Sequence, residues 1–233
     1  MSDEVVIVTG AGKGIGKEIA FEFAKEGFIV AVCARTSENI KTVEREIKER
    51  GGKSLGVTCD VGDEAEVKKF IAKVSEKGSI KVLVNNAGIA FIGPVSSMDS
   101  SKWEETLRVN LTGAFLVTKH ALEFMDRGTH IFNITSNAAK IGFPNWSAYC
   151  ASKFGLLGFT NSLREELREK GIKVTAIIPG PTDTPLWDEI QGSWDRKKMM
   201  SPSDVARIVV NVYKQPRGTV TEEVFMMPAG GAL

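Results

Sequence analysis

A tyrosine and a lysine stand four positions apart in this chain, Tyr149 and Lys153, within the segment SAYCASK. A helix that begins near Ser147 places both side chains on one face, with their Cβ atoms about 6 Å apart. A free tyrosine has a pKa of about 10, and lowering that pKa to about 7 requires about 4 kcal/mol of preference for the phenolate. A nearby ammonium group in a desolvated cleft could supply this preference. The spacing therefore predicts an acid/base pair in which the lysine tunes the tyrosine.

A glycine-rich segment, TGAGKGIG at residues 9–16, directly follows the apolar run 5–8. Gly10 permits a tight turn, Gly14 lets the backbone approach a pyrophosphate closely, and Gly16 lets the following helix pack against a sheet. The unpaired N–H groups and the positive dipole end of that helix favour an anion. We therefore expect this turn to bind the phosphates of a cofactor.

Three residues separate Gly10 from Gly14, so the pattern is TGxxxGxG and not the GxGxxG of most dinucleotide-binding sheets. This form resembles the short-chain dehydrogenase/reductase family. Further pieces of the family pattern stand in order: Asp60 after a strand, NNAG at 85–88, Asn110, Ser136, YCASK at 149–153 and PGPTDT at 179–184. Together they span residues 5 to about 185, and seven ordered matches at compatible spacings do not arise by accident.

The resemblance implies a catalytic set of Asn110, Ser136, Tyr149 and Lys153. In that family the tyrosine donates a proton to the substrate carbonyl oxygen as hydride arrives, or removes it in the reverse direction, and the lysine also holds the nicotinamide ribose. The serine helps to hold the substrate oxygen. The asparagine lies beside a backbone-bound water that relays protons to the lysine.

The end of the second expected strand indicates which nicotinamide cofactor binds. An NAD-preferring site would place Asp or Glu there to bind the adenosine 2′-hydroxyl, but Ala34 occupies that position. Arg35 follows it and Lys13 stands in the glycine-rich turn, so two cations can converge on a 2′-phosphate. We therefore expect NADP(H), the alternative being that both cations are solvated surface charges.

The resemblance also places other cofactor contacts. Asp60 and Val61 flank the adenine, the NNAG turn lies against the cofactor and steadies the sheet, and Thr184 reaches the nicotinamide carboxamide. The expected cofactor-binding residues are Gly10, Gly12, Lys13, Gly14, Ile15, Gly16, Arg35, Asp60, Val61, Asn86, Ala87, Gly88, Tyr149, Lys153, Pro179, Gly180, Thr182 and Thr184.

Apolar and aromatic side chains near these motifs form the candidate substrate pocket. The irregular segment 181–201, rich in Pro, Trp and Gly, is the natural substrate lid. This composition predicts an apolar, aromatic or cyclic carbonyl compound, although core or lid packing explains such residues equally well. The expected substrate-binding residues are Ser136, Asn137, Phe143, Tyr149 and Trp187, within a wider set that adds Ile89, Phe91, Ile141, Trp146 and Trp194.

Composition narrows the functional class. A net charge of +1 with 25% charged residues indicates neither nucleic-acid nor membrane binding, and no apolar run approaches the roughly 18 residues of a membrane span, so we expect a cytoplasmic protein. The three scattered cysteines suit buried thiols better than disulfides or a metal site. Ser136 is not expected to act as a nucleophile, because His120 and His130 show no triad pattern.

Strand and helix patterns alternate along the chain. Six apolar runs predict buried parallel strands, in a sheet of about seven strands. These runs lie at 5–8, 28–33, 54–58, 81–84, 131–135 and 172–178. Helical patterns cover about 15–26, 38–50, 64–77, 101–126, 147–170 and 203–215, and most end at glycines. This alternation predicts a single α/β domain over 1–233, a doubly wound Rossmann sheet with helices on both faces and ligands beyond the strand C-termini.

Two functions fit these observations. The first is an NADP(H)-dependent carbonyl reductase or alcohol dehydrogenase, and the second is a non-catalytic NADP(H)-binding redox sensor.

The helices 101–126 and 147–170 resemble those that pair across a two-fold axis in the family, which implies a homo-dimer or homo-tetramer. The chain ends VFMMPAGGAL without the Asp-Gly-Gly turn of typical 3-oxoacyl carrier-protein reductases, which leaves open both their substrate and their tetrameric assembly.

Overall fold

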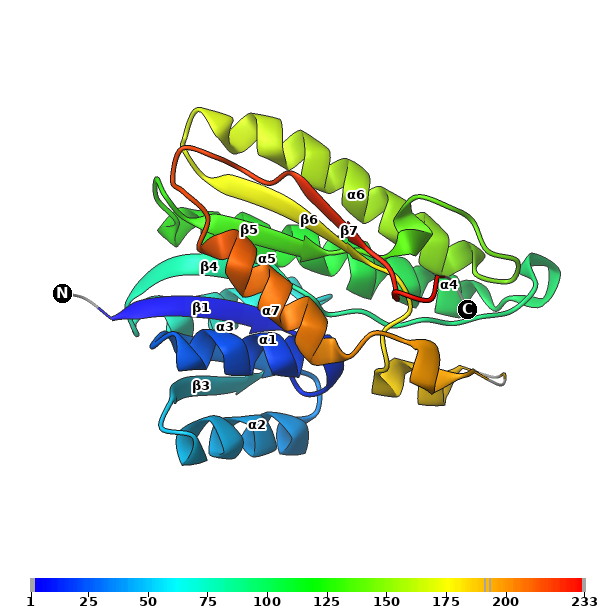
Figure 1. Cartoon of the computed structure of the whole chain (residues 1–233), viewed down its shortest axis with the longest axis horizontal. Coiled ribbons are helices and arrows are strands. Elements are labelled where there is room, and N and C mark those ends of the chain that lie inside the picture. The colour runs from blue at the N-terminus through cyan, green and yellow to red at the C-terminus, as the bar shows by residue number, and fades with distance from the viewer. Residues whose placement is uncertain (1–2, 191, 193, 232–233) are drawn as a thin grey trace.

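The computed structural model describes residues 3–190, 192 and 194–231, and within them seven parallel strands form one sheet (Figure 1). The strand order β3-β2-β1-β4-β5-β6-β7 reverses direction between β1 and β4, as a doubly wound sheet requires. The strands are β1 Glu4–Thr9, β2 Ile29–Ala34, β3 Lys53–Thr58, β4 Ser79–Asn85, β5 His130–Ile134, β6 Lys173–Pro179 and β7 Glu223–Met226.

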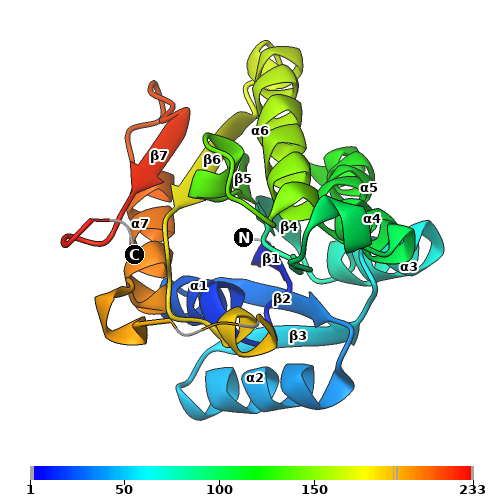
Figure 2. The same ribbon diagram turned by 90° about the vertical axis from the view of Figure 1, so that its right-hand side faces the viewer.

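Helices cover both faces of the sheet (Figure 2). One apolar cluster joins α1, α2 and α7 to one face, and a second joins α3, α5 and α6 to the other. Within β1, Val6 and Val8 point into the first cluster while Val5 and Ile7 point into the second, the alternation that a strand buried on both faces requires. The helices are α1 Gly14–Lys25, α2 Ser37–Glu49, α3 Glu64–Ser75, α4 Ser100–Leu107, α5 Gly113–Ala121, α6 Ser147–Arg168 and α7 Pro202–Tyr213.

Local sequence sets most of the helix ends. Gly27 and Gly171 adopt positive φ angles of 89° and 69° just beyond α1 and α6, a backbone conformation that favours glycine. Asp63 accepts hydrogen bonds from the first turn of α3, and Ser201 forms a reciprocal capping box with Asp204 at the start of α7. The predicted boundaries therefore hold to within about two residues for these helices.

The predicted helix 101–126 is wrong as one regular helix. The chain forms α4, then a π-helical turn at Arg108–Thr112, then α5 and a short 3₁₀ turn. Asn110 lies in the π turn and is 1% exposed. Such turns insert a residue into the α-helical hydrogen-bond ladder and often occur at functional sites.

The strand β7, which no apolar run had located, closes one edge of the sheet. Its four residues alternate between exposed and half-buried, so its sequence lacks the continuous apolar run of the inner strands. It pairs with β6 from Ala176 to Pro179. None of the described helices is long and apolar enough to cross a membrane.

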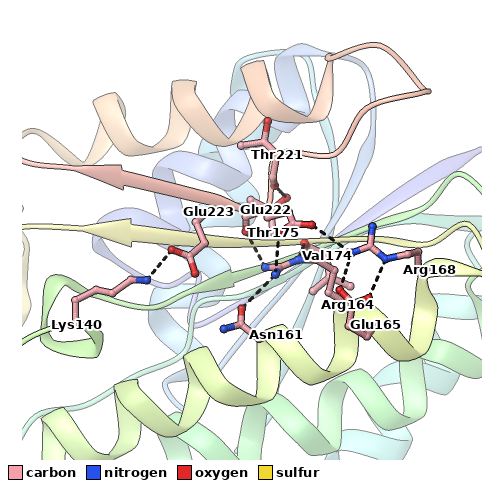
Figure 3. A network of polar contacts seen from close by, with 10 residues as sticks. All are labelled: Lys140, Asn161, Arg164, Glu165, Arg168, Val174, Thr175, Thr221, Glu222 and Glu223. Atoms are coloured by element: carbon pink, nitrogen blue, oxygen red, sulfur yellow. Dashed lines mark hydrogen bonds and ion pairs between the residues drawn. The ribbon is translucent and has the colours of Figure 1, made fainter.

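A buried arginine on α6 holds β6 and the approach to β7 together (Figure 3). Arg164 is 7% exposed; its Nε donates to the Val174 carbonyl at 3.0 Å and its Nη2 donates to the Glu222 carbonyl at 2.8 Å. Its Nη1 reaches Asn161 Oδ1 at 3.2 Å. The neighbouring Arg168 also pairs with Glu222, but its side chain is half-exposed.

Replacing Arg164 with Met should lower the free energy of unfolding by about 3 kcal/mol, because the carbonyl of the buried Val174 and that of Glu222 both lose a charged donor. Arg168→Met is the matched control, and its effect should be much smaller because solvent screens its ion pairs. Urea unfolding of both variants measures the difference. Equal losses would show that the Arg164 contacts do not hold this edge of the sheet.

Candidate active site

A cavity of about 580 Å³ lies beyond the C-terminal ends of the strands. In Figure 1 this edge of the sheet is on the right, where the segment after β6 extends past the strand ends. The glycine-rich turn after β1 lines one part of the cavity and the beginning of α6 lines another. The cavity therefore lies where the topology of a doubly wound sheet places ligands.

The glycine-rich turn has a shape that larger residues would not allow. Gly10 has φ +63°, and a Cβ there would lie 2.7 Å from Ala87 Cα. Gly14 has φ +58°, and a Cβ there would lie 3.3 Å from the Thr184 side chain. The helix α1 that follows has no side-chain N-cap and no acidic residue in its first turn, so its N–H groups can receive a phosphate. These features fit a cofactor pyrophosphate.

The role expected of Gly16 differs from what the structure shows. A Cβ on Gly16 would lie 2.3 Å from Asn86 Nδ2 and 2.8 Å from Gly10 O. The close approach is therefore to the NNAG turn and not to the sheet. Asn86 uses this space, since its Nδ2 donates to the carbonyls of Thr9 at 2.9 Å and Gly10 at 3.2 Å.

Thr9 joins the glycine-rich turn to the NNAG turn, a role that the motif did not reveal. Its Oγ1 accepts hydrogen bonds from the backbone N–H of Asn86 at 3.0 Å and of Ala87 at 3.1 Å. The side chain is 2% exposed. Thr9 is the last residue of β1 and faces the end of the neighbouring strand β4. A threonine at this position of the motif is the sequence signal that could have predicted this role.

The two cations predicted for a 2′-phosphate line the cavity beside Ala34. Each is already paired: Lys13 Nζ with Glu189 at 2.6 Å, and Arg35 Nη1 with Glu105 at 3.2 Å. Both cationic side chains are half-exposed. A phosphate here would compete with two carboxylates. Two further residues that the sequence analysis did not name, Thr36 and Asn39, line the same part of the cavity.

Asp60 and Val61 also line the cavity, after β3. Partial burial alone would raise the pKa of Asp60, but hydrogen bonds from Arg108 at 3.0 Å and from Gly62 N at 2.9 Å leave that pKa below its usual value. Asp60 is therefore a fixed carboxylate. It ties the loop after β3 to the π turn that carries Asn110.

Lys153 lies one helical turn after Tyr149 in α6, as the spacing predicted. Its side chain is 4% exposed, and its Nζ donates to the Ile134 carbonyl at the end of β5 at 2.9 Å. The Nζ lies 5.6 Å from the centre of the Tyr149 ring. Burial lowers the pKa of Lys153 to about 8, because the charged ammonium is desolvated.

The predicted lowering of the Tyr149 pKa does not occur in this structure. Burial raises the pKa of Tyr149 to about 12, and a hydrogen bond with Ser136 opposes that rise only in part. The Lys153 ammonium lies 5.6 Å from the centre of the Tyr149 ring and donates to Ile134 O, and it does not offset the desolvation of the phenol. Tyr149 is therefore a protonated acid at neutral pH.

Ser136 lies two residues beyond the end of β5 and lines the cavity. Its Oγ accepts a hydrogen bond from Ala138 N at 3.2 Å and donates to Asn137 Oδ1 at 3.1 Å. These contacts fix the hydroxyl at the start of a 3₁₀ turn, Asn137–Ala139. The hydroxyl therefore lies beside Tyr149, and its hydrogen-bond partners are Asn137, Ala138 and Tyr149.

Asn110 is held from both sides and does not line the cavity. Its Oδ1 accepts from Ile89 N at 2.8 Å, and its Nδ2 donates to Ile89 O at 2.9 Å and to Ser152 Oγ at 2.9 Å. Ser152 in turn donates to the Tyr149 carbonyl at 2.7 Å. Ser152, fully buried within the YCASK motif, is a positioning residue that the sequence analysis did not single out.

A small polar space separates Asn110 from Lys153. A Cβ on Gly88 would lie 3.4 Å from Asn110 Oδ1 and 3.6 Å from Lys153 Nζ, so both polar groups border one position beside the Gly88 backbone. The glycine keeps this position open. A residue with a side chain would fill it with a methyl group.

The expected substrate residues line the other end of the cavity, with two exceptions. Phe91 carries Lys102 over its ring at 5.6 Å, and Ile141 is 53% exposed; neither lines the cavity. Of the predicted lid 181–201, Gln191 and Ser193 lie outside the described residues. Residues lining this end that the sequence analysis did not name are Ala138, Pro144, Leu186 and Ile190.

The remaining predicted residues meet at this one cavity. Besides Phe91 and Ile141, only Asn110 and Gly16 among the expected residues do not line it, and Asn110 bonds to Ile89, which does. Residues from six separate segments therefore converge on a single site.

Comparison with known proteins gives the family. A profile of the family described as short chain dehydrogenase matches residues 4–193. The chain belongs to the short-chain dehydrogenase family. This confirms the resemblance drawn from the motifs, and the doubly wound sheet agrees with it. As a short-chain dehydrogenase the protein is an oxidoreductase, as the sequence predicted.

Individual relatives match over almost the whole short-chain dehydrogenase chain. A sepiapterin reductase of Chlorobaculum tepidum is 35% identical, covering 97% of both chains. A putative ketoacyl reductase of Streptomyces coelicolor is 37% identical, covering 98% of this chain and 92% of that protein. A variant of the actinorhodin polyketide ketoreductase, solved with NADPH, has a TM-score of 0.88 and 33% identity, covering 98% of both chains.

The pKa values predict the pH dependence of this short-chain dehydrogenase. The kcat/KM for NADPH should fall as pH rises through about 8, because Lys153 then loses its proton, whereas Tyr149 stays protonated to about 12. Lys153→Arg keeps the charge, so the fall in kcat/KM should move to higher pH in this variant, even if turnover drops. An unchanged midpoint in that variant would assign the limb to another group.

Proposed function

We propose that this short-chain dehydrogenase is an NADP(H)-dependent oxidoreductase that reduces a ketone or aldehyde to an alcohol, or catalyses the reverse reaction. The observation that carries the proposal is the meeting of two kinds of group in one cavity. A phosphate-receiving glycine turn lines one end, and a protonated tyrosine beside a serine hydroxyl lines the other.

The residues divide the chemistry among them. The cofactor supplies hydride to the carbonyl carbon when it is bound. Ser136 holds the carbonyl oxygen, and Tyr149 donates its phenolic proton to that oxygen as negative charge develops there. Lys153 lies next to the tyrosine and its ammonium donates to Ile134 O. Asn110 and Lys153 both border the polar position beside Gly88. These groups would return a proton to Tyr149 after each turnover.

Tyr149→Phe should keep NADPH affinity within a few-fold but lower turnover by at least about 100-fold, the usual contribution of a positioned acid. The reason is that the hydroxyl contacts the reacting oxygen while the glycine-rich turn holds the cofactor. NADPH binding by fluorescence and ketone reduction at 340 nm measure the two effects separately.

Near-normal turnover in this variant would show that Tyr149 is not the proton donor.

An alternative function is a non-catalytic NADP(H) sensor, which would bind the cofactor yet reduce no compound in a broad panel of ketones, quinones, thioesters, pteridines and sugars. The buried lysine at the tyrosine favours the enzyme, because a sensor has no need for a desolvated ammonium there.

The choice of NADP(H) over NAD(H) rests on the residues after β2. Ala34 offers no carboxylate to repel a 2′-phosphate, and Arg35 and Lys13 line the cavity next to it. Solved relatives carry the same cofactor class: the actinorhodin ketoreductase variant contains NADPH, and a metagenomic short-chain oxidoreductase with 33% identity and a TM-score of 0.86 contains NADP, with 98% of this chain and 99% of that one covered.

Arg35→Ala should weaken NADPH binding about 10-fold while scarcely changing NADH, because only the 2′-phosphate contacts this guanidinium. Ala34→Asp should move preference further toward NADH, since its carboxylate repels the phosphate and accepts a hydrogen bond from the free ribose hydroxyl. The measurement is kcat/KM for both cofactors in the parent and both variants. A parent that prefers NADH would show that Lys13 and Arg35 are only surface charges.

We also propose self-association through the helices that follow β4 and β5. Phe115 on α5 and Phe154 on α6 are both 46% exposed, and Phe115 packs against Phe159 of α6 with ring centres 6.3 Å apart. Exposed aromatic rings on adjacent helices are typical of an interface. The surface fits a second copy of this chain, in a dimer or a tetramer.

Light scattering at micromolar concentration should therefore give a mass at least twice the 25.3 kDa of one chain. Phe115→Glu with Phe154→Glu should lower that mass, because the added charges would be buried between the two copies. Lys119→Glu, on the same helix but paired with Glu64 at the surface, is a control. A parent protein that is monomeric would contradict the proposed interface.

A further inference from the structure

Three of the four tryptophans of this chain gather at one end of the cavity. Trp146 immediately precedes α6, while Trp187 and Trp194 come from the segment after β6. Their ring centres lie 6.0 Å apart for Trp146 and Trp187, 6.5 Å for Trp146 and Trp194, and 4.8 Å for Trp187 and Trp194. We call Trp146, Trp187 and Trp194 the tryptophan triad.

The triad adjoins the reacting groups. The ring of Trp146 meets the ring of Tyr149 edge to face, with centres 5.6 Å apart and planes at 72°. Phe143 packs against Trp146 on another side, with ring centres 6.3 Å apart. A molecule whose carbonyl oxygen reaches Tyr149 therefore has its body beside these aromatic rings.

The segment that brings Trp187 and Trp194 is held by its own contacts. Trp187 Nε1 donates to the Thr182 carbonyl at 2.8 Å. Arg196 binds the carboxylates of Asp183 and Asp188 and donates to the Thr184 carbonyl at 3.0 Å. Arg196 thus pairs with two of the acidic side chains of the segment, and Glu189, which lines the cavity, pairs with Lys13.

The charged side chains that line the cavity already have partners, among them Lys153 with Ile134 O and Asp60 with Arg108. Lys13 and Arg35 are paired with Glu189 and Glu105, near the expected phosphate position. Among the described residues, the polar side chain of Asn137 and the unpartnered indole nitrogen of Trp194 line the cavity around the triad, together with six apolar residues: Ile89, Ala138, Phe143, Pro144, Leu186 and Ile190. A charged substrate body placed there would lose its hydration without gaining a partner.

We propose that the substrate is an uncharged ketone carried on a flat aromatic or fused-ring system, which packs against the tryptophan triad while its oxygen meets Tyr149. This inference rests on the proposed carbonyl reductase function. Aromatic rings favour offset-stacked or edge-to-face contacts with other rings, so a flat ring gains more from the triad than a puckered ring of equal size. A flexible acyl chain or a carboxylate gains less still.

A matched pair of ketones tests the inference. 2-Tetralone and 2-decalone share a two-ring skeleton, but only the first has a flat aromatic ring. We expect kcat/KM with NADPH to be at least about 10-fold higher for 2-tetralone. Trp187→Leu should abolish most of this difference by lowering the value for 2-tetralone. Trp103→Phe, which changes the one tryptophan outside the triad, on α4, should leave both values unchanged.

Binding can be measured without turnover in the unmodified protein by tryptophan fluorescence, because three of the four tryptophans form the triad. 2-Tetralone should quench this emission, 2-decalone should do so much less, and the quenching should persist in Tyr149→Phe. Quenching by 2-tetralone with no reduction of any ketone would contradict the proposed function and support the ligand class. Equal kcat/KM and equal quenching for both ketones would overturn the inference, as would faster reduction of an acetoacetyl thioester with no quenching by 2-tetralone.

Discussion

One buried cation sets the geometry of this active site. Lys153 carries an ammonium that is almost completely removed from water and that donates to one backbone carbonyl, Ile134 O, at 2.9 Å. A buried charge is costly unless it is well paired, so the end of β5 and the first turns of α6 must stay in register. That register also places Ser136 and Tyr149 side by side. In the proposed mechanism, catalysis therefore depends on how firmly the end of β5 and the start of α6 are joined.

Residue types and spacing could predict most of the fold and most of the residues that meet in the cavity. Glycines that end helices and apolar runs that mark strands are local signals. They can therefore be read from the sequence without knowledge of tertiary contacts. Three features depend on contacts between distant segments and could not be read in this way. Burial sets the pKa of Tyr149 in the direction opposite to the prediction, the π turn holds Asn110 on Ile89, and Ser152 links that asparagine to the backbone of the tyrosine.

The two ends of the cavity have different physical characters, and this separates recognition of the cofactor from recognition of the substrate. At the glycine-rich turn, half-exposed cations already paired with carboxylates can exchange partners at little cost. At the other end, half-buried indole rings pack against one another and against Tyr149. Changes at one end should therefore alter cofactor choice or substrate choice without altering the proton donor between them.

We propose that this cavity directs hydride from a nicotinamide to a carbonyl carbon while the protein supplies the proton. The fate of deuterium from NADPH that carries deuterium at both hydrogens of C4 tests this, in reactions with ketones analysed by mass spectrometry. We predict that the alcohol carries one deuterium on its carbinol carbon, and that an alcohol formed in heavy water from unlabelled NADPH carries none there. An alcohol without deuterium from the labelled cofactor, or with deuterium from solvent on that carbon, would contradict the account.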